Sequence, residues 1–208
     1  MNSGLYRLDD GQVRCWWCQG HDDYEVYHDN EWGHPVADDH RLFEKICLEG
    51  FQAGLSWLTI LRKRAAFRKA FCNFDYHKVA QFGSKHVGKL LQDAGIIRHR
   101  GKIEATINNA QRAVEMEEEY GALGVFFWQH EPKRRRGALK TRADACFHTS
   151  CDEATVMSKT LKKNGWKFVG PTTAYAFMQS MGMVNDHLNK CSCHRKIEDL
   201  RSEFDRPV

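Results

Sequence analysis

The chain has 208 residues, of which 42% are hydrophobic and 28% are charged, and its formal net charge is +4. This length and balance predict one globular domain with a hydrophobic core. No apolar run approaches the roughly 20 residues of a membrane span, and residues 1–11 lack the features of a secretory signal. We therefore expect a cytoplasmic protein whose eight cysteines are thiols or metal ligands rather than disulfides. The mild positive charge permits a polyanionic partner without requiring one.

Helical patterns dominate the chain, and alternating strand patterns are nearly absent. The first thirteen residues are expected to form a loose extension, and residues 131–151 a surface excursion whose basic run, 133–136, is solvated. The sequence therefore predicts an all-α fold. Its helices are expected at about 39–54, 59–71, 85–94, 103–120, 123–128, 152–163 and 171–182.

The helix that follows Asp38 carries an unusual carboxylate. Leu42, Ile46, Glu49 and Ala53 recur at helical spacing and share one face. A carboxylate on an apolar stripe is costly to bury unless it is paired. The spacing also fits a simpler arrangement, in which Glu49 lies at the edge of the stripe and reaches water.

Cysteines and histidines occur near both ends of the chain. Mixed thiolate and imidazole ligands at such spacings are typical of a structural zinc site, which would join the terminal segments. Free surface thiols are the alternative. Two ligand sets fit the spacing: Cys15, His28, His187 and Cys191, or the all-thiolate set of Cys15, Cys18, Cys191 and Cys193.

Residues 162–173 predict two helices joined by a tight turn between Gly165 and Gly170. Free amides at a helix N-terminus suit a phosphate, and lysines flank the turn. A helical hairpin with a solvated basic rim would show the same pattern. The candidate phosphate contacts are Lys163, Gly165, Lys167, Gly170, Thr172 and Thr173.

Several aromatic residues in the first part of the chain could sandwich a flat ring, since aromatic faces stack on nucleobases and attract cations. Ordinary core packing is the alternative for the same residues. The chain has no phosphate-binding loop, dinucleotide fingerprint or Gly-x-Ser-x-Gly motif. The aromatic candidates are Trp17, Tyr24, Tyr27, Trp32 and Trp57.

In combination these residues resemble the type I DNA-3-methyladenine glycosylases of the helix-hairpin-helix superfamily. The resemblance covers about residues 14–193, with no clear counterpart for the first thirteen residues or for a tail at 194–208. Its most specific blocks are Tyr-His-Asp-Asn-Glu-Trp-Gly (27–33), Cys-Leu-Glu-Gly (47–50), Gln-Ala-Gly-Leu-Ser-Trp (52–57), Asp-Ala-Gly-Ile-Ile-Arg-His-Arg-Gly-Lys (93–102), Phe-Val-Gly-Pro-Thr-Thr (168–173) and Asn-Asp-His (185–187).

The resemblance implies a two-lobed helical fold, with the helix-hairpin-helix unit at about 153–182 on DNA phosphate. It selects the mixed zinc set of Cys15, His28, His187 and Cys191, one Zn²⁺ per chain. It also implies that Glu49 hydrogen-bonds the damaged base. Tyr27, Trp57 and Trp17 would stack on the base, and Tyr24 and Trp32 would shape the wall.

The activity implied by the resemblance is repair of double-stranded alkylated DNA by a monomeric enzyme. The enzyme would flip out 3-methyladenine and hydrolyse its glycosidic bond, with Leu55 as an apolar wedge. No lysine is indicated as a Schiff-base nucleophile, so we expect no strand cleavage. Asp186 could assist catalysis or orient His187. The competing classes are a non-catalytic, zinc-stapled DNA-binding module and a zinc hydrolase.

Overall fold

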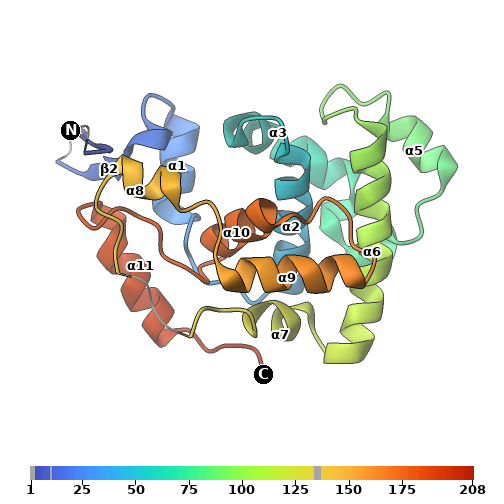
Figure 1. Cartoon of the computed structure of the whole chain (residues 1–208). Coiled ribbons are helices and arrows are strands. Elements are labelled where there is room, and N and C mark those ends of the chain that lie inside the picture. Colours follow the sequence, from blue (N-terminus) through green and yellow to red (C-terminus); the bar gives the residue numbers. More distant parts are fainter. Residues whose placement is uncertain (1–2, 10, 134–136) are drawn as a thin grey trace.

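The computed structural model describes residues 3–9, 11–133 and 137–208. Helix α2 (Asp39–Gln52) runs through the middle of the molecule (Figure 1). The carboxylate of Asp38 caps it by accepting a hydrogen bond from the backbone N–H of Arg41 at 2.8 Å. Every residue from Leu42 to Phe51 is buried. Because α2 is surrounded on all sides, even its polar residues must find partners inside the protein.

The remaining helices pack around α2 in the described part of the chain. Helices α3, α6, α7 and α10 contact α2 directly. The bounds of these helices are α1 Asp22–Asn30, α3 Trp57–Ala70, α4 Tyr76–Val79, α5 Ser84–Leu90, α6 Arg100–Tyr120, α7 Leu123–Trp128, α8 Arg142–Phe147, α9 Asp152–Lys163, α10 Pro171–Ser180 and α11 Ser192–Glu203, with 3-10 turns η1 Trp16–Cys18 and η2 Cys72–Phe74.

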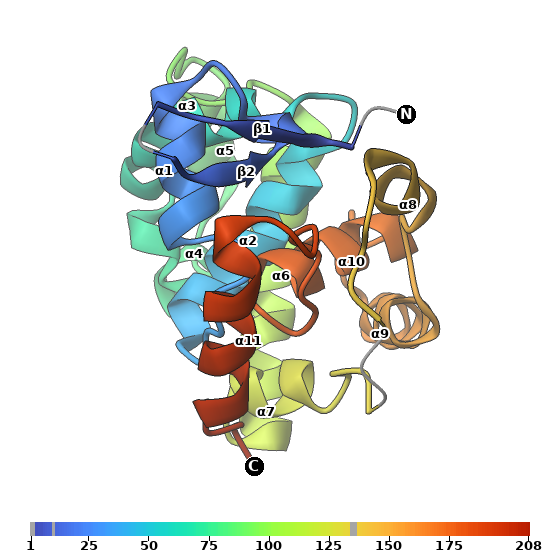
Figure 2. The ribbon, with the colours of Figure 1, turned by 90° about the vertical axis from the view of Figure 1, so that its left-hand side faces the viewer.

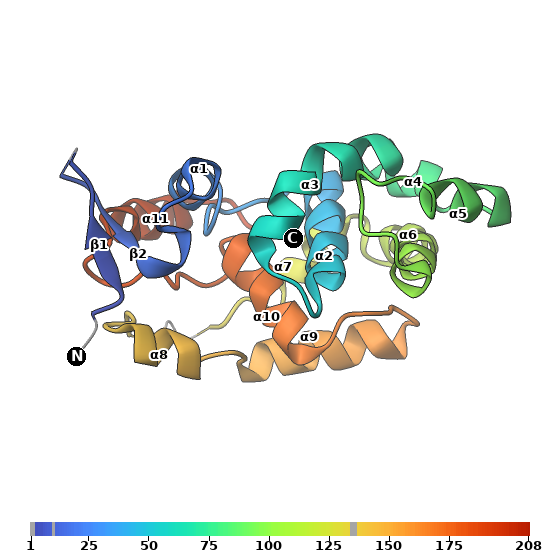
Figure 3. The ribbon, with the colours of Figure 1, turned by 90° about the horizontal axis from the view of Figure 1, so that it is seen from above.

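Two groups of elements lie on opposite sides of α2 and α10 (Figure 3). Helices α4, α5 and α6 form one side. The other side combines both terminal segments of the chain, because α1 lies beside α11 and a short β-hairpin. Helices α2 and α10 therefore lie where the two sides meet.

The described residues near the start of the chain form a β-hairpin and not the expected loose extension. Strand β1 (Leu5–Arg7) pairs antiparallel with β2 (Val13–Cys15). Each strand has only three residues, which is too short to give a recognisable alternating pattern. The prediction of an all-α fold is therefore corrected to a helical fold with one two-stranded sheet.

The expected tail at 194–208 also differs, because α11 begins at Ser192 and crosses the predicted boundary (Figure 2). Ile197 is fully buried, and the buried Arg201 donates hydrogen bonds to the carbonyls of Gly182 and Met183, both at 2.8 Å. These contacts attach α11 to the segment after α10. They join residues that are distant in the sequence, so local patterning could not predict them.

The excursion at 131–151 contains helix α8, capped reciprocally by Thr141 and Asp144. The basic run predicted to be solvated lies at 133–136, and residues 134–136 of it fall outside the described residues. The helices predicted at 123–128 and 152–163 are confirmed with the same bounds. In the described part of the chain, no helix is both long and apolar enough to cross a membrane.

Candidate active site and metal centre

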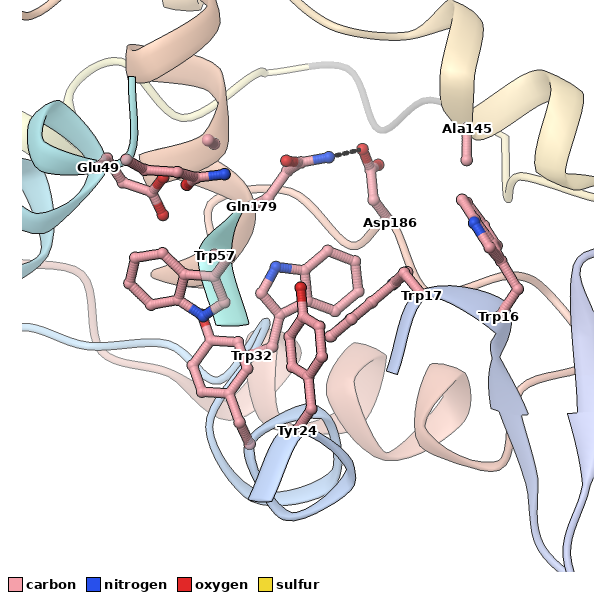
Figure 4. Close-up of a pocket in the computed structure, with 12 residues that line it drawn as sticks. Trp16, Trp17, Tyr24, Trp32, Glu49, Trp57, Ala145, Gln179 and Asp186 are labelled. Atoms are coloured by element: carbon pink, nitrogen blue, oxygen red, sulfur yellow. Dashed lines mark hydrogen bonds between the residues drawn. The ribbon is translucent and has the colours of Figure 1, made fainter. Parts of the chain in front are cut away.

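A pocket opens between the two sides of the molecule, and aromatic rings form much of its wall (Figure 4). We call it the aromatic pocket. Its volume of about 240 Å³ lies below the range of about 300–1,000 Å³ typical of drug-sized ligand sites, so it suits one flat ring system. It is lined by Trp16, Trp17, Tyr24, Tyr27, Trp32, Glu49, Gln52, Trp57, Ala145, Ala176, Gln179 and Asp186.

The structure brings together all five predicted ring-binding residues. Trp17 is central among them, with its ring centroid 4.8 Å from that of Tyr24 and 4.9 Å from that of Trp32. Tyr27 and Trp57 form a second pair, with centroids 5.6 Å apart. These residues come from η1, α1, the turn after α1 and the start of α3. The rings of Trp17 and Tyr27, with centroids 6.4 Å apart, link the second pair to the group around Trp17, and together they form one wall with the geometry of favourable aromatic contacts.

Glu49 projects from α2 into this pocket and is only 6% exposed. The alternative in which it reaches water at the edge of a stripe is therefore wrong. Its Oε1 atom lies 2.9 Å from Nζ of Lys45, one helical turn earlier. The ammonium compensates for burial of the carboxylate, which would otherwise be strongly unfavourable.

Lys45 contacts two of the aromatic residues as well. Its Nζ atom donates a hydrogen bond to Oη of Tyr27 at 2.8 Å and lies 3.2 Å from the ring centroid of Trp57. Burial lowers the pKa of Lys45 to about 8, against the opposing effect of Glu49. The pKa of Tyr27 lies well above its usual value, mainly because of burial and then because of Glu49. Tyr27 therefore keeps its proton at neutral pH.

Asp186 lies on the far wall of the pocket. Its Oδ2 atom accepts hydrogen bonds from the hydroxyl of Tyr175 at 2.7 Å and from Nε2 of Gln179 at 2.8 Å. Figure 4 shows the bond to Gln179, which faces the same space as Glu49. Nε2 of His187 has the carbonyl oxygen of Trp32 as its partner at 3.1 Å, so that carbonyl orients the imidazole.

A group of four buried ligand residues lies behind the aromatic wall, and we call it the Cys/His cluster. Its potential ligand atoms all lie within 4.8 Å of one another. Sγ of Cys191 lies 3.6 Å from Nε2 of His28 and 3.6 Å from Nδ1 of His187. The cluster joins β2 and α1 to the segment before α11. Its members are Cys15, His28, His187 and Cys191.

The outward nitrogens of both histidines are held by acceptors. Nδ1 of His28 lies 2.7 Å from Oδ1 of Asp29, and Nε2 of His187 lies 3.1 Å from the carbonyl oxygen of Trp32. Asp29 is itself fixed by Arg14, whose NH2 lies 2.6 Å from Oδ2. These bonds direct the remaining nitrogen of each imidazole into the cluster, as is usual for metal-binding histidines. Two thiols and two such imidazoles fit a tetrahedral metal ion.

The all-thiolate set does not assemble. The thiol of Cys18 donates to the carbonyl of Cys15 at 3.2 Å and contacts the hydroxyl of Tyr6 at 3.3 Å. Cys193 lies beside the cluster, with Sγ 3.9 Å from Nδ1 of His28. That nitrogen is already bonded to Asp29. The fold therefore brings together the mixed set of two cysteines and two histidines.

The predicted hairpin is present as α9, a turn at 164–170 and α10. The indole of Trp166 is buried under the turn, and the backbone of Gly165 has φ +82, a conformation that favours glycine. Gly50 of α2 lets the turn approach closely, because a Cβ atom there would lie 3.3 Å from Cβ of Phe168. Lys163, Gly165, Lys167 and Thr172 are exposed, whereas Gly170 and Thr173 are partly covered.

Leu55 occupies the turn between α2 and α3 and is 42% exposed. The turn is anchored from below by the buried Lys102, which donates to the carbonyls of Phe51 at 2.8 Å and Ala53 at 2.6 Å. The hydroxyl of Ser56 then caps α3 through the backbone N–H of Thr59. An aliphatic side chain is thus presented to solvent on a rigid turn two residues before Trp57.

Comparison with known proteins agrees with this geometry. A family model for methyladenine glycosylases matches residues 17–195. The chain belongs to this family. It is 48% identical over 184 residues to DNA-3-methyladenine glycosylase 1 of Escherichia coli K12, covering 87% of this chain and 96% of the relative. It is 45% identical over 185 residues to the DNA-3-methyladenine glycosylase of Haemophilus influenzae, covering 87% and 97%.

Solved structures of methyladenine glycosylases share the fold. A crystal structure of 3-methyladenine DNA glycosylase I has a TM-score of 0.82 and 44% identity, covering 87% of this chain and 99% of that chain. A structure of the Staphylococcus aureus enzyme, which addresses its recognition of 3-methyladenine, has a TM-score of 0.80 and 36% identity. The alignment covers 85% of this chain and 93% of that one.

Sequence reasoning missed several residues of this methyladenine glycosylase site. Gln179 lies one helical turn after Tyr175 on α10, and Gln52 lies one helical turn after Glu49 on α2. Helical spacing therefore places Gln52 on the same face as Glu49, and Gln179 on the same face as Tyr175. Trp16, which precedes Trp17, also lines the pocket and was not among the predicted aromatic residues. The main omission was Lys45, although its i,i+4 spacing from Glu49 is the usual spacing of a helical ion pair.

Proposed function

We propose that this protein is a monofunctional glycosylase that removes 3-methyladenine from double-stranded alkylated DNA. The observation that carries the proposal is the aromatic pocket with its buried, ion-paired Glu49. The similarity to DNA-3-methyladenine glycosylase 1 of Escherichia coli supports it. So does the similarity to a 3-methyladenine DNA glycosylase I solved in complex with 3-methyladenine, at 36% identity.

The damaged nucleotide must leave the base stack before it can enter the pocket. The hairpin at 164–170 would hold backbone phosphates, with Lys163 and Lys167 beside the free amides of Thr172 and Thr173. Leu55 would fill the space that the nucleotide vacates. These contacts position the protein on DNA without selecting a base.

Selection would then occur inside the pocket. Methylation at N3 makes the base cationic while it is attached to the sugar. Tyr27, Trp57 and Trp17 would stack on the ring through their electron-rich faces, and the carboxylate of Glu49 would hydrogen-bond it. Tyr24 and Trp32 would limit the width of the pocket. Unmethylated adenine lacks the positive charge and gains less from the same groups.

The positive charge on the base also weakens its bond to the sugar. Water attacks the sugar carbon as the glycosidic bond breaks, the bond electrons neutralise the departing base, and the attacking water releases a proton to solvent. The products are free 3-methyladenine and an abasic site. Lys45 does not line the pocket and is engaged by Glu49, Tyr27 and Trp57. We therefore expect no Schiff base with the sugar and no strand cleavage.

The Cys/His cluster would hold one structural Zn²⁺. Four protein ligands leave no open position for water, which argues against a zinc hydrolase, and the ion would tie the β-hairpin and α1 to the segment before α11. We propose that the protein acts as a monomer. The helix-hairpin-helix unit would comprise about residues 153–182. The predicted domain limits of 14 and 193 cut through β2 and α11, so the domain would include both of these elements.

The decisive experiment incubates zinc-replete protein with methylated duplex DNA and separates the released bases by chromatography. We expect release of 3-methyladenine with little 7-methylguanine and with intact strands. Binding to DNA without release of any base would contradict the proposal and favour a non-catalytic DNA-binding module. Strand cleavage at the abasic site would contradict the monofunctional mechanism alone.

A further inference from the structure

Lys45 lies behind the wall of the aromatic pocket and has no direct part in the proposed reaction. Its side chain is 8% exposed, which is rare for lysine. A small cavity of about 30 Å³ adjoins it and shares Tyr27 and Trp57 with the aromatic pocket. The ammonium nevertheless contacts three pocket residues at once: the carboxylate of Glu49, the hydroxyl of Tyr27 and the indole ring of Trp57.

We propose that Lys45 is a positioning residue, whose single ammonium group sets the orientation of Glu49, Tyr27 and Trp57 and supplies the counter-charge of the Glu49 carboxylate. The inference rests on the proposed function and extends it to a residue that does not touch the base. An ammonium offers three N–H donors. Here they face a carboxylate, a phenol oxygen and the electron-rich face of an indole, so one ammonium group can orient three side chains.

The ion pair also gives the pocket a useful charge distribution. Burying a carboxylate without a counter-charge is strongly unfavourable. The ammonium 2.9 Å away supplies that counter-charge to Glu49. Because Glu49 faces the pocket and Lys45 lies behind it, the pair is a dipole with its negative end toward the ligand. A net-neutral pair can thus still attract a cationic base.

Tyr27 gains a defined hydrogen-bonding role from the same contact. Its oxygen accepts from Lys45 at 2.8 Å, so its own hydrogen is available to an acceptor on another side. For Trp57, the cation lies over one ring face at 3.2 Å from the centroid. The indole also lines the pocket, so it can stack on a base while it remains fixed from behind.

Two other carboxylates lie near Lys45, and each has an arginine partner. Glu31 lies just after α1 and pairs with Arg64 of α3. The NH2 group of Arg64 donates a hydrogen bond to Oε1 of Glu31 at 2.7 Å. Burial raises the pKa of Glu31, but the hydrogen bond from Arg64 lowers it further, below its usual value. Glu44 is paired with Arg68. Since the pKa of Lys45 is about 8 and that of Tyr27 is well above 10, Lys45 is the group of this set that changes charge near pH 8.

The test compares the parent protein with Lys45→Met and Lys45→Arg in single-turnover excision from about pH 7 to pH 9.5. Methionine keeps the length and helical preference but removes the charge. We expect Lys45→Met to be at least tenfold slower at pH 7, and Lys45→Arg to recover part of that loss. The parent rate should fall several-fold through a midpoint near pH 8. Neither variant should show that fall.

Lys85→Met is the matched control, since Lys85 is exposed on α5, and it should retain the parent profile. If Lys45→Met excises as fast as the parent at pH 7, the proposal is wrong. It is equally wrong if Lys45→Met is slow but keeps the transition near pH 8, because the role of Lys45 would then be only structural.

A second readout does not depend on catalysis. Protonated Lys45 over Trp57 should give the free protein a change in tryptophan fluorescence near pH 8, absent from Lys45→Met and from Trp57→Phe. If this transition is present and no base is released from methylated DNA, the positioning geometry stands and the proposed glycosylase function fails. If base is released but the transition is absent, the function stands and the inference about Lys45 is overturned.

Discussion

The side chain of Asn109 makes two hydrogen bonds to the backbone of Lys167, in the turn of the hairpin. Its Nδ2 atom donates to the carbonyl of Lys167 at 3.0 Å, and its Oδ1 atom accepts from the N–H of Lys167 at 2.8 Å. Asn109 lies on α6 and is 3% exposed. A helix distant in the sequence therefore sets the shape of the turn proposed to hold DNA phosphate.

Replacing Asn109 by alanine should weaken both the fold and DNA binding. Two backbone groups of the turn would lose their partners, at a cost of about 1–3 kcal/mol in unfolding free energy. Affinity for undamaged duplex DNA, measured by fluorescence anisotropy, should fall several-fold at fixed salt. Gln111→Ala on the same helix is the control, because Gln111 is exposed and bonds elsewhere. Unchanged affinity in Asn109→Ala would show that the turn does not contact DNA.

The fold was predictable where local signals were strong. Helices α7 and α9 match their predicted bounds. Helix α7 is a short apolar and aromatic run, whereas α9 has acidic residues in its first turn and lysines in its last turn. The β-hairpin and α11 were not predictable in the same way. The hairpin is held by the pairing of Leu5 with Cys15, and α11 by bonds from Arg201 to Gly182 and Met183. Strands of three residues are too short to show an alternating pattern, and the bonds that hold α11 join residues 18 and 19 positions apart, so neither leaves a periodic trace in the sequence.

For the candidate site, the residue types were easier to predict than their partners. The aromatic residues and Glu49 were identified from their chemistry and from the family resemblance. Lys45 was not, because a lysine on a helix is usually solvated. Spacing alone also left two ligand sets open, and the family resemblance implied the mixed one. Only the fold shows that Cys18 faces the hydroxyl of Tyr6 while His28 and His187 face Cys191.

Removal of the proposed metal ion should unfold the part of the protein that it joins. Cys191→Ser and His187→Ala should each lower the zinc content from one ion per chain toward zero and reduce the melting temperature. The reason is that binding energy at a structural site contributes directly to folding. Cys146→Ser is the matched control, since Cys146 is exposed. Elemental analysis with calorimetry measures both effects. A chelator that removed activity at an unchanged melting temperature would contradict a structural role.

Leu55→Ala should impair base extrusion more than the reaction itself. The variant removes most of an exposed side chain that is 42% accessible, so its stability should stay within about 0.5 kcal/mol of the parent. Excision from methylated duplex should slow several-fold, while excision from methylated single strands should be unaffected. Val156→Ala on α9 is the control, because Val156 is a comparably exposed aliphatic residue. Equal slowing on both substrates would argue against a wedge.

Glu49→Gln should affect stability and excision through different routes. It keeps the shape of the side chain but leaves the buried ammonium of Lys45 without its counter-charge. Breaking a buried ion pair from one side costs about 3–5 kcal/mol, and loss of the lysine proton limits that cost. Excision should fall at least tenfold because the carboxylate that selects the cationic base is gone.

The double variant Lys45→Met with Glu49→Gln separates these routes. Removing both charges relieves the unpaired ammonium, so the unfolding free energy measured with denaturant should return toward the parent value. Excision should remain as low as in Glu49→Gln, because the negative end of the dipole is still missing. Recovery of both stability and excision would mean that Glu49 acts only as the counter-charge of Lys45. In that case the aromatic rings alone would select the damaged base.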